Sequence, residues 1–449
     1  MFGGTYKRAG FAAGIAAAGL ALVGTAPASA ADLGGNCCAD LEERIAELEA
    51  TAARKGNRKV SLTVSGFVNE AVLGWDDGVE RNAYVVTNET AQDRVRFLGQ
   101  AQIAPGWNAG YLLELGVRGA REDRISQDGP GADNGVSVRH SAWYLSGKEY
   151  GKVWVGQTSD AADGITEINL ANTNHFSYSN SWGNTFGDGG SGFFVRRTDG
   201  VLSAARYGQF VARGTQQAIP GEGHRFNVVK YEAPTIAGFT ASAAWGEDDI
   251  WNIALRYAGE FSGFKLAGGI AYTESNDIPG PDHTSGVSRG VGDTQEFGLS
   301  ASIFHVETGL YASGAYGHLH DDGLDALYGR NVDDDTSFWT IQAGIERKFF
   351  PIGKTTVFGE YFNLDRGAAS TNSGGILNVP TLGTGFNQVA NSQIEGWGVG
   401  LNQNLSEVVD LYLSYKHVQL DVTTTNGVAT RDASIDAIQF ITAGAQIKF

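Results

Sequence analysis

The segment RVRFLGQAQIAPGWNAGYLLELGVRG, residues 94–119, alternates apolar and polar side chains on both sides of a short turn. The apolar face of its first half, residues 94–104, carries Val95, Phe97, Ala101 and Ile103. The apolar face of its second half, residues 110–119, carries Tyr111, Leu113, Leu115 and Val117. Successive side chains of a β-strand point to opposite faces, so the segment predicts two amphipathic strands. Pro105 and Gly106 predict the tight turn that joins them.

The same alternation recurs along the chain after Lys59, in segments separated alternately by short turns and long polar loops. We expect sixteen strands, at residues 60–75, 93–104, 109–120, 137–146, 151–158, 224–233, 239–246, 250–260, 263–273, 294–305, 308–317, 337–348, 354–364, 393–403, 409–418 and 435–449. An even number of strands of about ten residues, with short turns at one end and longer loops at the other, is typical of transmembrane barrels. The sequence therefore predicts an all-β fold, a 16-stranded antiparallel transmembrane β-barrel formed by residues 60–449.

The first 59 residues do not follow this pattern. Lys7 and Arg8 precede an apolar stretch that ends in APASA, residues 26–30, and this arrangement predicts a cleaved signal peptide at residues 1–30. In residues 31–59 the apolar spacing becomes helical, through Leu41, Ile45 and Leu48. We expect a short periplasmic helix and hinge here, either paired in a three-stranded coiled coil or lying loosely on the surface. Cys37 and Cys38 lie at the start of this helix. They either form interchain disulfides or have no role, and the sequence leaves both alternatives open.

The chain ends on a strand-like segment, SIDAIQFITAGAQIKF, whose last residue is Phe449. Its apolar face carries Ile441, Ala443, Ala445, Ile447 and Phe449. A terminal aromatic residue on a membrane strand, together with a signal peptide, favours a barrel inserted into an outer membrane. We expect Phe449 to be the assembly signal that the barrel-assembly machinery reads.

The composition excludes several classes of function. The chain carries 33 Lys and Arg against 50 Asp and Glu, a net charge of −17, which disfavours binding to nucleic acid. The eight histidines show no metal-binding spacing, so we expect no metal site and no cofactor. Acidic clusters such as HDDG (320–323) and VDDDTS (332–337) could hold divalent cations that bridge to lipopolysaccharide, although solvated acid is the preferred interpretation.

Three stretches resemble the porins of alphaproteobacterial outer membranes. They are LEERIAELEATAARKGNRKVSLTVSGFVNEAVLGWDDG (41–78), VGQTSDAADGITEINL (155–170) and the final GAQIKF. The resemblance covers essentially the whole chain in order. It implies a sixteen-stranded, trimeric, water-filled channel in the outer membrane of a Gram-negative cell, without a cofactor, for small hydrophilic solutes.

The same resemblance implies that one external loop folds inward and narrows the pore. The longest interval between predicted strands, residues 159–223, is the candidate for this constriction loop. Its predicted pore-facing carboxylates are Asp160, Asp163 and Glu167. The predicted basic wall opposite them consists of Arg94, Arg96, Arg118 and Arg139, and Arg196, Arg197 and Arg206 are additional loop cations. Charges that face each other across a constriction order polar solutes and repel apolar ones.

These expectations lead to a general diffusion channel without enzymatic activity. A channel with a saturable, substrate-specific site is the alternative, and the sequence does not decide between them. The acidic excess predicts a mild cation preference, unless the wall arginines dominate the narrowest ring.

Overall fold

The computed structural model describes residues 60–130, 132–179, 181–182, 192–211, 219–246, 249–275, 294–322, 334–367 and 379–449. The predicted signal peptide (1–30) and the predicted periplasmic helix with Leu41, Ile45 and Leu48 lie outside these residues. Within the described ranges, no helix is long and apolar enough to cross a membrane.

The described strands form one antiparallel sheet of 18 strands and one separate hairpin. Sixteen strands make the barrel wall: β1 (Ser61–Asp76), β3 (Arg94–Ala104), β4 (Trp107–Ala120), β5 (Ala132–Gly147), β6 (Gly151–Ser159), β9 (Arg225–Glu232), β10 (Phe239–Gly246), β11 (Ile250–Phe261), β12 (Phe264–Ser275), β13 (Thr294–His305), β14 (Leu310–Asp321), β15 (Asp335–Phe350), β16 (Gly353–Arg366), β17 (Gln388–Ser406), β18 (Val409–Thr425) and β20 (Ile438–Lys448). The shorter elements are β2 (Arg81–Thr87), β19 (Thr430–Asp432), the hairpin β7 (Phe194–Arg196) and β8 (Leu202–Arg206), and the 3₁₀ turns η2 (Glu89–Ala91), η3 (Glu122–Arg124), η4 (Tyr207–Gln209) and η5 (Pro380–Leu382). The predicted all-β class and the predicted number of wall strands are confirmed for the described residues.

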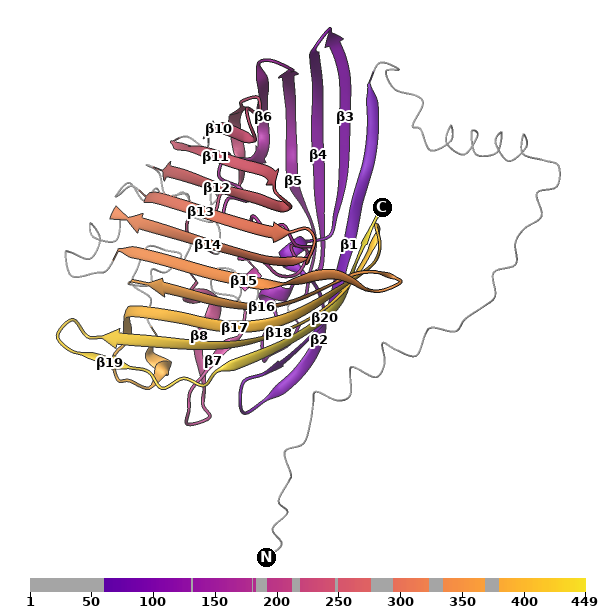
Figure 1. The fold of residues 1–449 in the computed structure, drawn as a ribbon. Helices are drawn as coiled ribbons and strands as arrows, with labels where there is room; N and C mark the ends of the chain where they lie inside the picture. The colour runs from indigo at the N-terminus through magenta and orange to yellow at the C-terminus, as the bar shows by residue number, and fades with distance from the viewer. Residues whose placement is uncertain are drawn as a thin grey trace, which may run out of the picture. The chain divides into compact units, whose positions relative to one another are not determined.

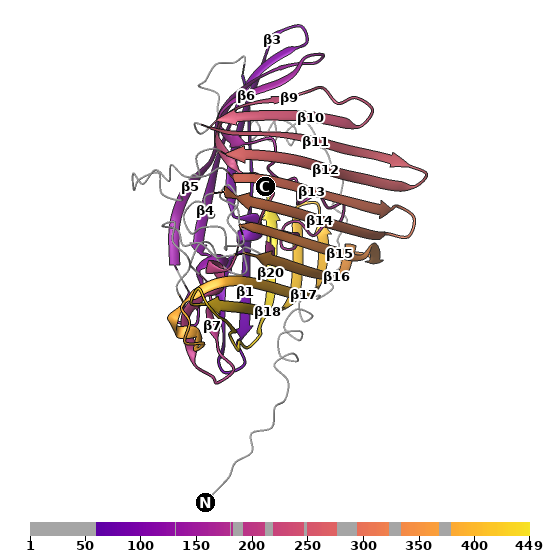
Figure 2. The same ribbon diagram turned by 90° about the vertical axis from the view of Figure 1, so that its left-hand side faces the viewer.

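Each wall strand pairs with its neighbour along the chain, so the colours follow one another around the sheet in Figure 1 and Figure 2. The circuit closes where β20 pairs with β1, in a register that runs from Phe67 opposite Lys448 to Asp76 opposite Gln439. Beyond this register, Gly66 and Phe449 exchange two backbone hydrogen bonds of 3.0 Å. A Cβ atom on residue 66 would lie 2.7 Å from the ring of Phe449, so glycine is required for this close approach.

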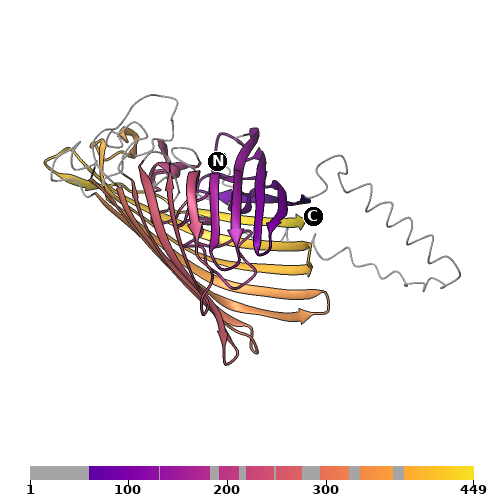
Figure 3. The same cartoon turned by 90° about the horizontal axis from the view of Figure 1, so that it is seen from above.

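The two ends of the barrel differ in the length of their connections. Tight turns join β3 to β4 and β11 to β12, and each contains a glycine at positive φ, Gly106 at 78° and Gly263 at 81°. The long connections lie at the other end, and the longest joins β6 to β9. Figure 3 shows the C terminus and β19 at opposite ends of the strands. Because β19 belongs to the long connection between β18 and β20, the C terminus lies at the end with the short turns. The predicted asymmetry of short turns and long loops is confirmed.

The wall alternates between two faces, and its apolar face is the exposed one. In β4 and β5, Val117 and Trp143 are 43% and 48% exposed, whereas Glu114 is 0% exposed. A soluble sheet would bury its apolar face, but a membrane barrel presents this face to lipid and turns the polar face inward. Glu114 therefore lies on the inner side of the wall, as its position in the pattern predicts.

The second strand of the barrel differs from the prediction. It begins at Arg81 rather than at residue 93. Residues 70–76 of β1 pair with β2, and residues 61–67 of β1 pair with β3, so β2 and β3 together form this strand of the wall. Between β2 and β3 the chain leaves the ladder as a bulge, residues 88–93, which contains η2. Polar residues that lie before a predicted strand look like loop in the sequence, so periodicity alone does not reveal such an interrupted strand.

A charged cavity between the barrel wall and an inward loop

The connection from β6 to β9 begins with a tight structure built around Asp160. This carboxylate is buried and accepts backbone hydrogen bonds from Ala162 (2.9 Å), Asp163 (2.7 Å) and His224 (3.2 Å). Burial, together with the neighbouring Asp163, raises the pKa of Asp160 to about 6. Because its hydrogen-bond donors come from both the start and the end of the loop, Asp160 joins the two ends and does not face the lumen.

Glu222 makes a second clamp at the far end of the same loop. Its carboxylate accepts the backbone N–H groups of Gly164 and Thr166, the latter at 2.8 Å, and the hydroxyl of Thr166. Burial, followed by the proximity of Glu167, raises the pKa of Glu222 well above its ordinary value. The start and the end of the loop are thus fastened to each other by two buried carboxyl groups.

From this clamp the loop crosses the inside of the barrel and contacts distant wall strands. The backbone N–H of Ile168 donates to Ser300 of β13 (3.2 Å), and Ser177 donates to Glu360 of β16 (2.6 Å). Asn172 donates from its side chain to Asp410 of β18 (2.8 Å). Because these acceptors belong to polar inner faces of strands far from β6, the described part of the loop lies within the lumen.

Trp182 holds the far side of this crossing segment. Its buried indole ring stacks on Phe362 of β16, with ring centroids 5.5 Å apart, and Nζ of Lys416 lies 4.7 Å above it. A Cβ atom on residue 396 of β17 would lie 2.3 Å from the same ring, so Gly396 provides the flat surface on which Trp182 packs.

The bulge between β2 and β3 meets the loop from the opposite wall. Asn69 of β1 donates from its side-chain amide to the carbonyl oxygens of Ala91 in the bulge (3.1 Å) and His175 in the loop (2.8 Å). Tyr178 of the loop donates to the carbonyl of Thr90 in the bulge (3.0 Å). Two non-ladder elements, one from each side, therefore come together in the lumen.

A polar cavity of about 650 Å³ lies between these two elements and the wall. Its charged lining residues are Arg94, Arg118, Arg139, Arg225, Lys448, Glu89, Asp163 and Glu167. The remaining lining is formed by Phe67, Thr90, Ala91, Gln92, Gly164, Ala171, Asn172, Asn174, His175, Tyr178 and Gln446. Among the described residues, five permanent cations thus face three carboxyl groups across this space.

Buried acids hold the arginines of the wall in place. Glu114, which solvent does not reach, pairs with Arg94 (3.6 Å), Arg96 (2.5 Å) and Arg139 (2.8 Å). One carboxylate thus orients three guanidinium groups and leaves an excess of positive charge toward the lumen. Lys448 is held in the same way by buried Asp410, at 2.9 Å.

Two ion pairs cross the cavity boundary between the wall and the inward elements. Arg225 of β9 lies 3.6 Å from Asp163 of the loop, and Arg118 of β4 lies 3.7 Å from Glu89 of the bulge. Burial opposes ionisation of Asp163, but Arg225 and the hydroxyl of Ser159 outweigh it and lower the pKa. Asp163 therefore stays negative at neutral pH.

Two other groups of the lining respond differently to their burial. Burial, reinforced by Asp123, raises the pKa of Glu89 to about 7, although Arg121 and Arg118 oppose the shift. Burial lowers the pKa of His175 to about 4, so this imidazole is neutral at physiological pH. Glu89 is thus a lining group whose charge changes near neutrality.

The structure brings five of the predicted pore residues to one cavity, namely Arg94, Arg118, Arg139, Asp163 and Glu167. Asp160 is buried in the base of the loop, and Arg96 pairs with Glu114 outside the cavity lining.

The predicted loop cations do not line this cavity either. Arg196 pairs with Asp77 (2.8 Å), Arg197 pairs with Asp199, and Arg206 lies over the ring of Phe194 (3.6 Å). These partners belong to the external loops and the β7–β8 hairpin. The reason is topological: residues 194–206 contact the connections after β1 and after β19, so their charges meet other loops.

Sequence reasoning missed three charged lining residues: Arg225, Glu89 and Lys448. Strand periodicity assigns Arg225 to the outer face with Val229 and Tyr231, and only its place at the first position of β9 brings it beside Asp163. Glu89 lies in the unrecognised bulge. Lys448 is on the predicted polar face of the last strand, but no local signal indicates that this strand ends beside the cavity.

The sequence matches the family model of Gram-negative porins over residues 16–423. The structure is similar to that of an anion-selective porin from Comamonas acidovorans, with a TM-score of 0.52 and 16% identity, over 87% of this chain and 100% of that one. It is also similar to OmpT of Vibrio cholerae, folded in vitro, with a TM-score of 0.50 and 12% identity, over 89% and 100% of the two chains. Identities this low show a shared fold only, and no match was found among curated protein sequences. Because the family model covers most of the chain, the protein belongs to the Gram-negative porins and forms an outer-membrane diffusion channel for small solutes.

Proposed function

We propose that the channel is a passive, size-limited pore that prefers small anions and works as a homotrimer. The observation that carries the anion preference is the lining of the charged cavity, where five permanent cations of the described part of the chain face three carboxyl groups. In a narrow aqueous space, rings of charged side chains decide which ions pass. The arginines of the wall therefore outweigh the acidic excess of the whole chain.

The net charge of −17 argues for cation preference only if it acts at the narrowest point. Most acidic clusters lie in external loops, and fields from exposed charges fall off over a Debye length of about 8–10 Å at ordinary salt. Glu114, which pairs with three arginines of the wall, and Asp410, which pairs with Lys448, are buried and are not available to a passing solute. The Comamonas acidovorans porin is described as anion-selective, which agrees with the proposal but shows only a similar fold.

Reversal potentials in planar bilayers under a KCl gradient test the anion preference. Arg118→Gln combined with Arg225→Gln removes two cations from the lining and should lower the ratio of chloride to potassium permeability. One charge about 6 Å away in water contributes about 0.7 kcal/mol, so each loss should change the ratio about threefold. The matched control is Arg347→Gln, because Arg347 is exposed on β15 and does not line the cavity. Cation selectivity of the unmodified channel would contradict the proposal.

A substrate-selective channel with a saturable site is the second candidate. The cavity of about 650 Å³, with several guanidinium groups, has the size and donors to hold one small anionic solute. Solute-specific, saturating block of single-channel current by a dicarboxylate, but not by chloride, would favour this candidate over a general pore.

The homotrimer rests on the resemblance to porins. Recordings from single inserted units should show three equal closing steps, and a single step per unit would contradict the homotrimer.

We further propose export through the predicted signal peptide (1–30), assembly signalled by Phe449, and contact of the outer loops with lipopolysaccharide. Phe449 is 61% exposed, so a receptor could reach its ring.

A further inference from the structure

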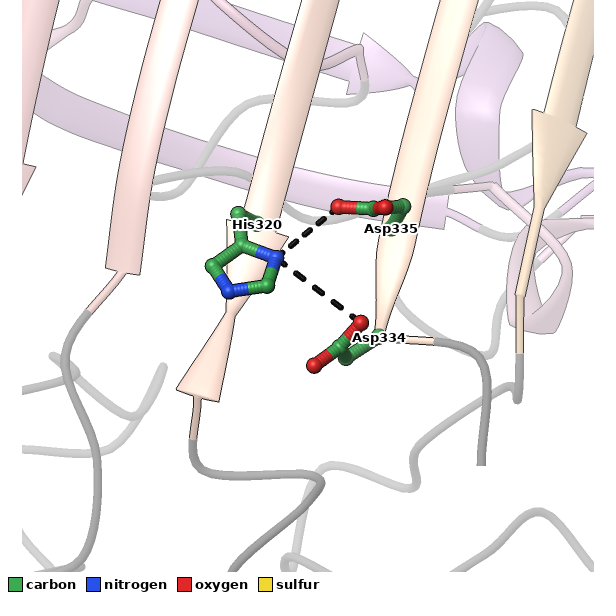
Figure 4. Close-up of side chains that lie close together, drawn as sticks. All are labelled: His320, Asp334 and Asp335. Carbon is green, nitrogen blue, oxygen red and sulfur yellow. Dashed lines mark hydrogen bonds and ion pairs between the residues drawn. The ribbon is translucent and has the colours of Figure 1, made fainter. Parts of the chain in front are cut away.

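Two histidines and three aspartates converge at the loop end of the β14–β15 pair. The register of this pair places His320 directly opposite Asp335. His318 and His320 are two residues apart and share one face of β14, while Asp322 and Asp334 directly flank the two strands. Figure 4 shows the imidazole of His320 pointing toward the carboxylates of Asp334 and Asp335.

The distances bring His320, Asp334 and Asp335 to one point, whereas Asp322 lies at the other nitrogen of the imidazole ring. Nδ1 of His320 lies 2.8 Å from Asp335 and 3.7 Å from Asp334, and its Nε2 lies 3.1 Å from Asp322. Nε2 of His318 lies 3.5 Å from the same Asp335 oxygen. The donor atoms of His320, Asp334 and Asp335 all lie within 4.8 Å of one another. Two ligands of a tetrahedral zinc ion are about 3.3 Å apart, so small side-chain rotations complete a site.

We propose that this cluster binds a divalent transition-metal ion of the Zn²⁺ type. The mixture of imidazole nitrogen and carboxylate oxygen suits zinc and related ions, whereas calcium and magnesium prefer oxygen ligands alone. The carboxylates supply the negative charge that compensates the ion. The cluster therefore differs from the other acidic runs of the outer loops, which form no comparable group of three donors among the described residues.

The position of the cluster determines what the metal would do. His318 and His320 follow Tyr316 on the outer face of β14, and Asp335 precedes Trp339 on the outer face of β15. Tyr316 and Trp339 face each other in the register and are exposed, as aromatic residues at a membrane interface are. The metal would thus join the two ends of the external β14–β15 connection, outside the lumen, at the rim of the barrel.

The test is zinc binding to the purified, EDTA-stripped protein in detergent. Cys37→Ser and Cys38→Ser form the background, because thiolates also bind zinc. Calorimetric titration with ZnCl₂ should give one ion per chain, and His320→Gln should weaken the affinity at least tenfold. His417→Gln is the matched control, since His417 is a half-buried histidine of β18 that stacks on Trp397 (5.7 Å between centroids). Heat-modified migration on gels verifies that each variant is folded.

Cu²⁺ as a spectroscopic probe gives a second readout. Electron paramagnetic resonance should show coupling to two imidazole nitrogens in the background protein and to one nitrogen in His318→Gln. Zinc affinity that His320→Gln leaves unchanged would overturn the proposal, and so would equal affinity for Zn²⁺ and Ca²⁺, which indicates only a charged surface. Single-channel conductance should not change on zinc binding, because the site faces away from the lumen.

Discussion

At the residue scale, Glu89 makes the selectivity of the pore depend on pH. Its pKa, raised to about 7 chiefly by burial, lies between the values at which bilayer experiments are run. Below pH 7 Glu89 gains a proton and loses its negative charge, so the lining becomes more positive. Lowering the pH from 8 to 6 should therefore raise the ratio of chloride to potassium permeability, by about threefold at most for one charge.

Glu89→Gln isolates this contribution, because the amide has no charge at either pH. The variant should show the higher anion preference at pH 8 and little further change at pH 6. Asp163 keeps a lowered pKa and His175 has a pKa of about 4, so neither changes charge in this interval. Asp160 has a pKa of about 6, but it is buried in the base of the loop and does not line the cavity. A pH dependence that survives Glu89→Gln undiminished would assign the effect to another group.

At the element scale, the position of the inward loop depends on the contact of Trp182 with Gly396. A valine at position 396 would place its Cβ atom 2.3 Å from the indole ring. Such overpacking costs about 1–3 kcal/mol, and the loop can avoid this cost by leaving the wall. Gly396→Val should therefore raise single-channel conductance and weaken selectivity, while the barrel remains folded.

Gly359→Val is the matched control for this change. Gly359 is an exposed glycine of the neighbouring strand β16, and the nearest atom to a Cβ there is 3.9 Å away. Valine at this position should leave conductance unchanged. Equal conductance of both variants and the unmodified channel would show that Trp182 does not hold the loop.

At the scale of the whole molecule, selectivity reflects where charge is placed more than how much charge the chain carries. The chain has a net charge of −17, yet the cavity of about 650 Å³ is lined mainly by cations. The Debye length falls from about 10 Å at 0.1 M salt to about 3 Å at 1 M. At 1 M salt the field of the lining charges therefore no longer extends across the cavity. The anion preference measured at 0.1 M should decline toward non-selective conduction at 1 M. A preference that does not change with salt would point to a dehydrated binding site instead.

The sequence by itself determined the class of fold and much of its strand order. Period-two alternation is set by the pleat of each strand, so segments such as residues 94–104 reveal their two faces without any long-range information. The same local rule placed Glu114, Arg94 and Arg118 on the inner face. This rule did not predict the bulge of residues 88–93, because side chains do not alternate with period two where the chain is not paired in a sheet.

Only the tertiary structure decided which charges meet. Arg139 is the unpaired residue of a β-bulge in β5, Arg225 leaves its expected face at the start of β9, and Lys448 reaches the cavity because β20 closes on β1. Asp160 and Asp163 are three residues apart, yet one is buried in the loop base and the other lines the cavity. The path of a loop across a lumen depends on partners more than a hundred residues away, such as Ser300 for Ile168. Local periodicity contains no information on those contacts, so the barrel follows from the sequence pattern but the selective site follows from the packing.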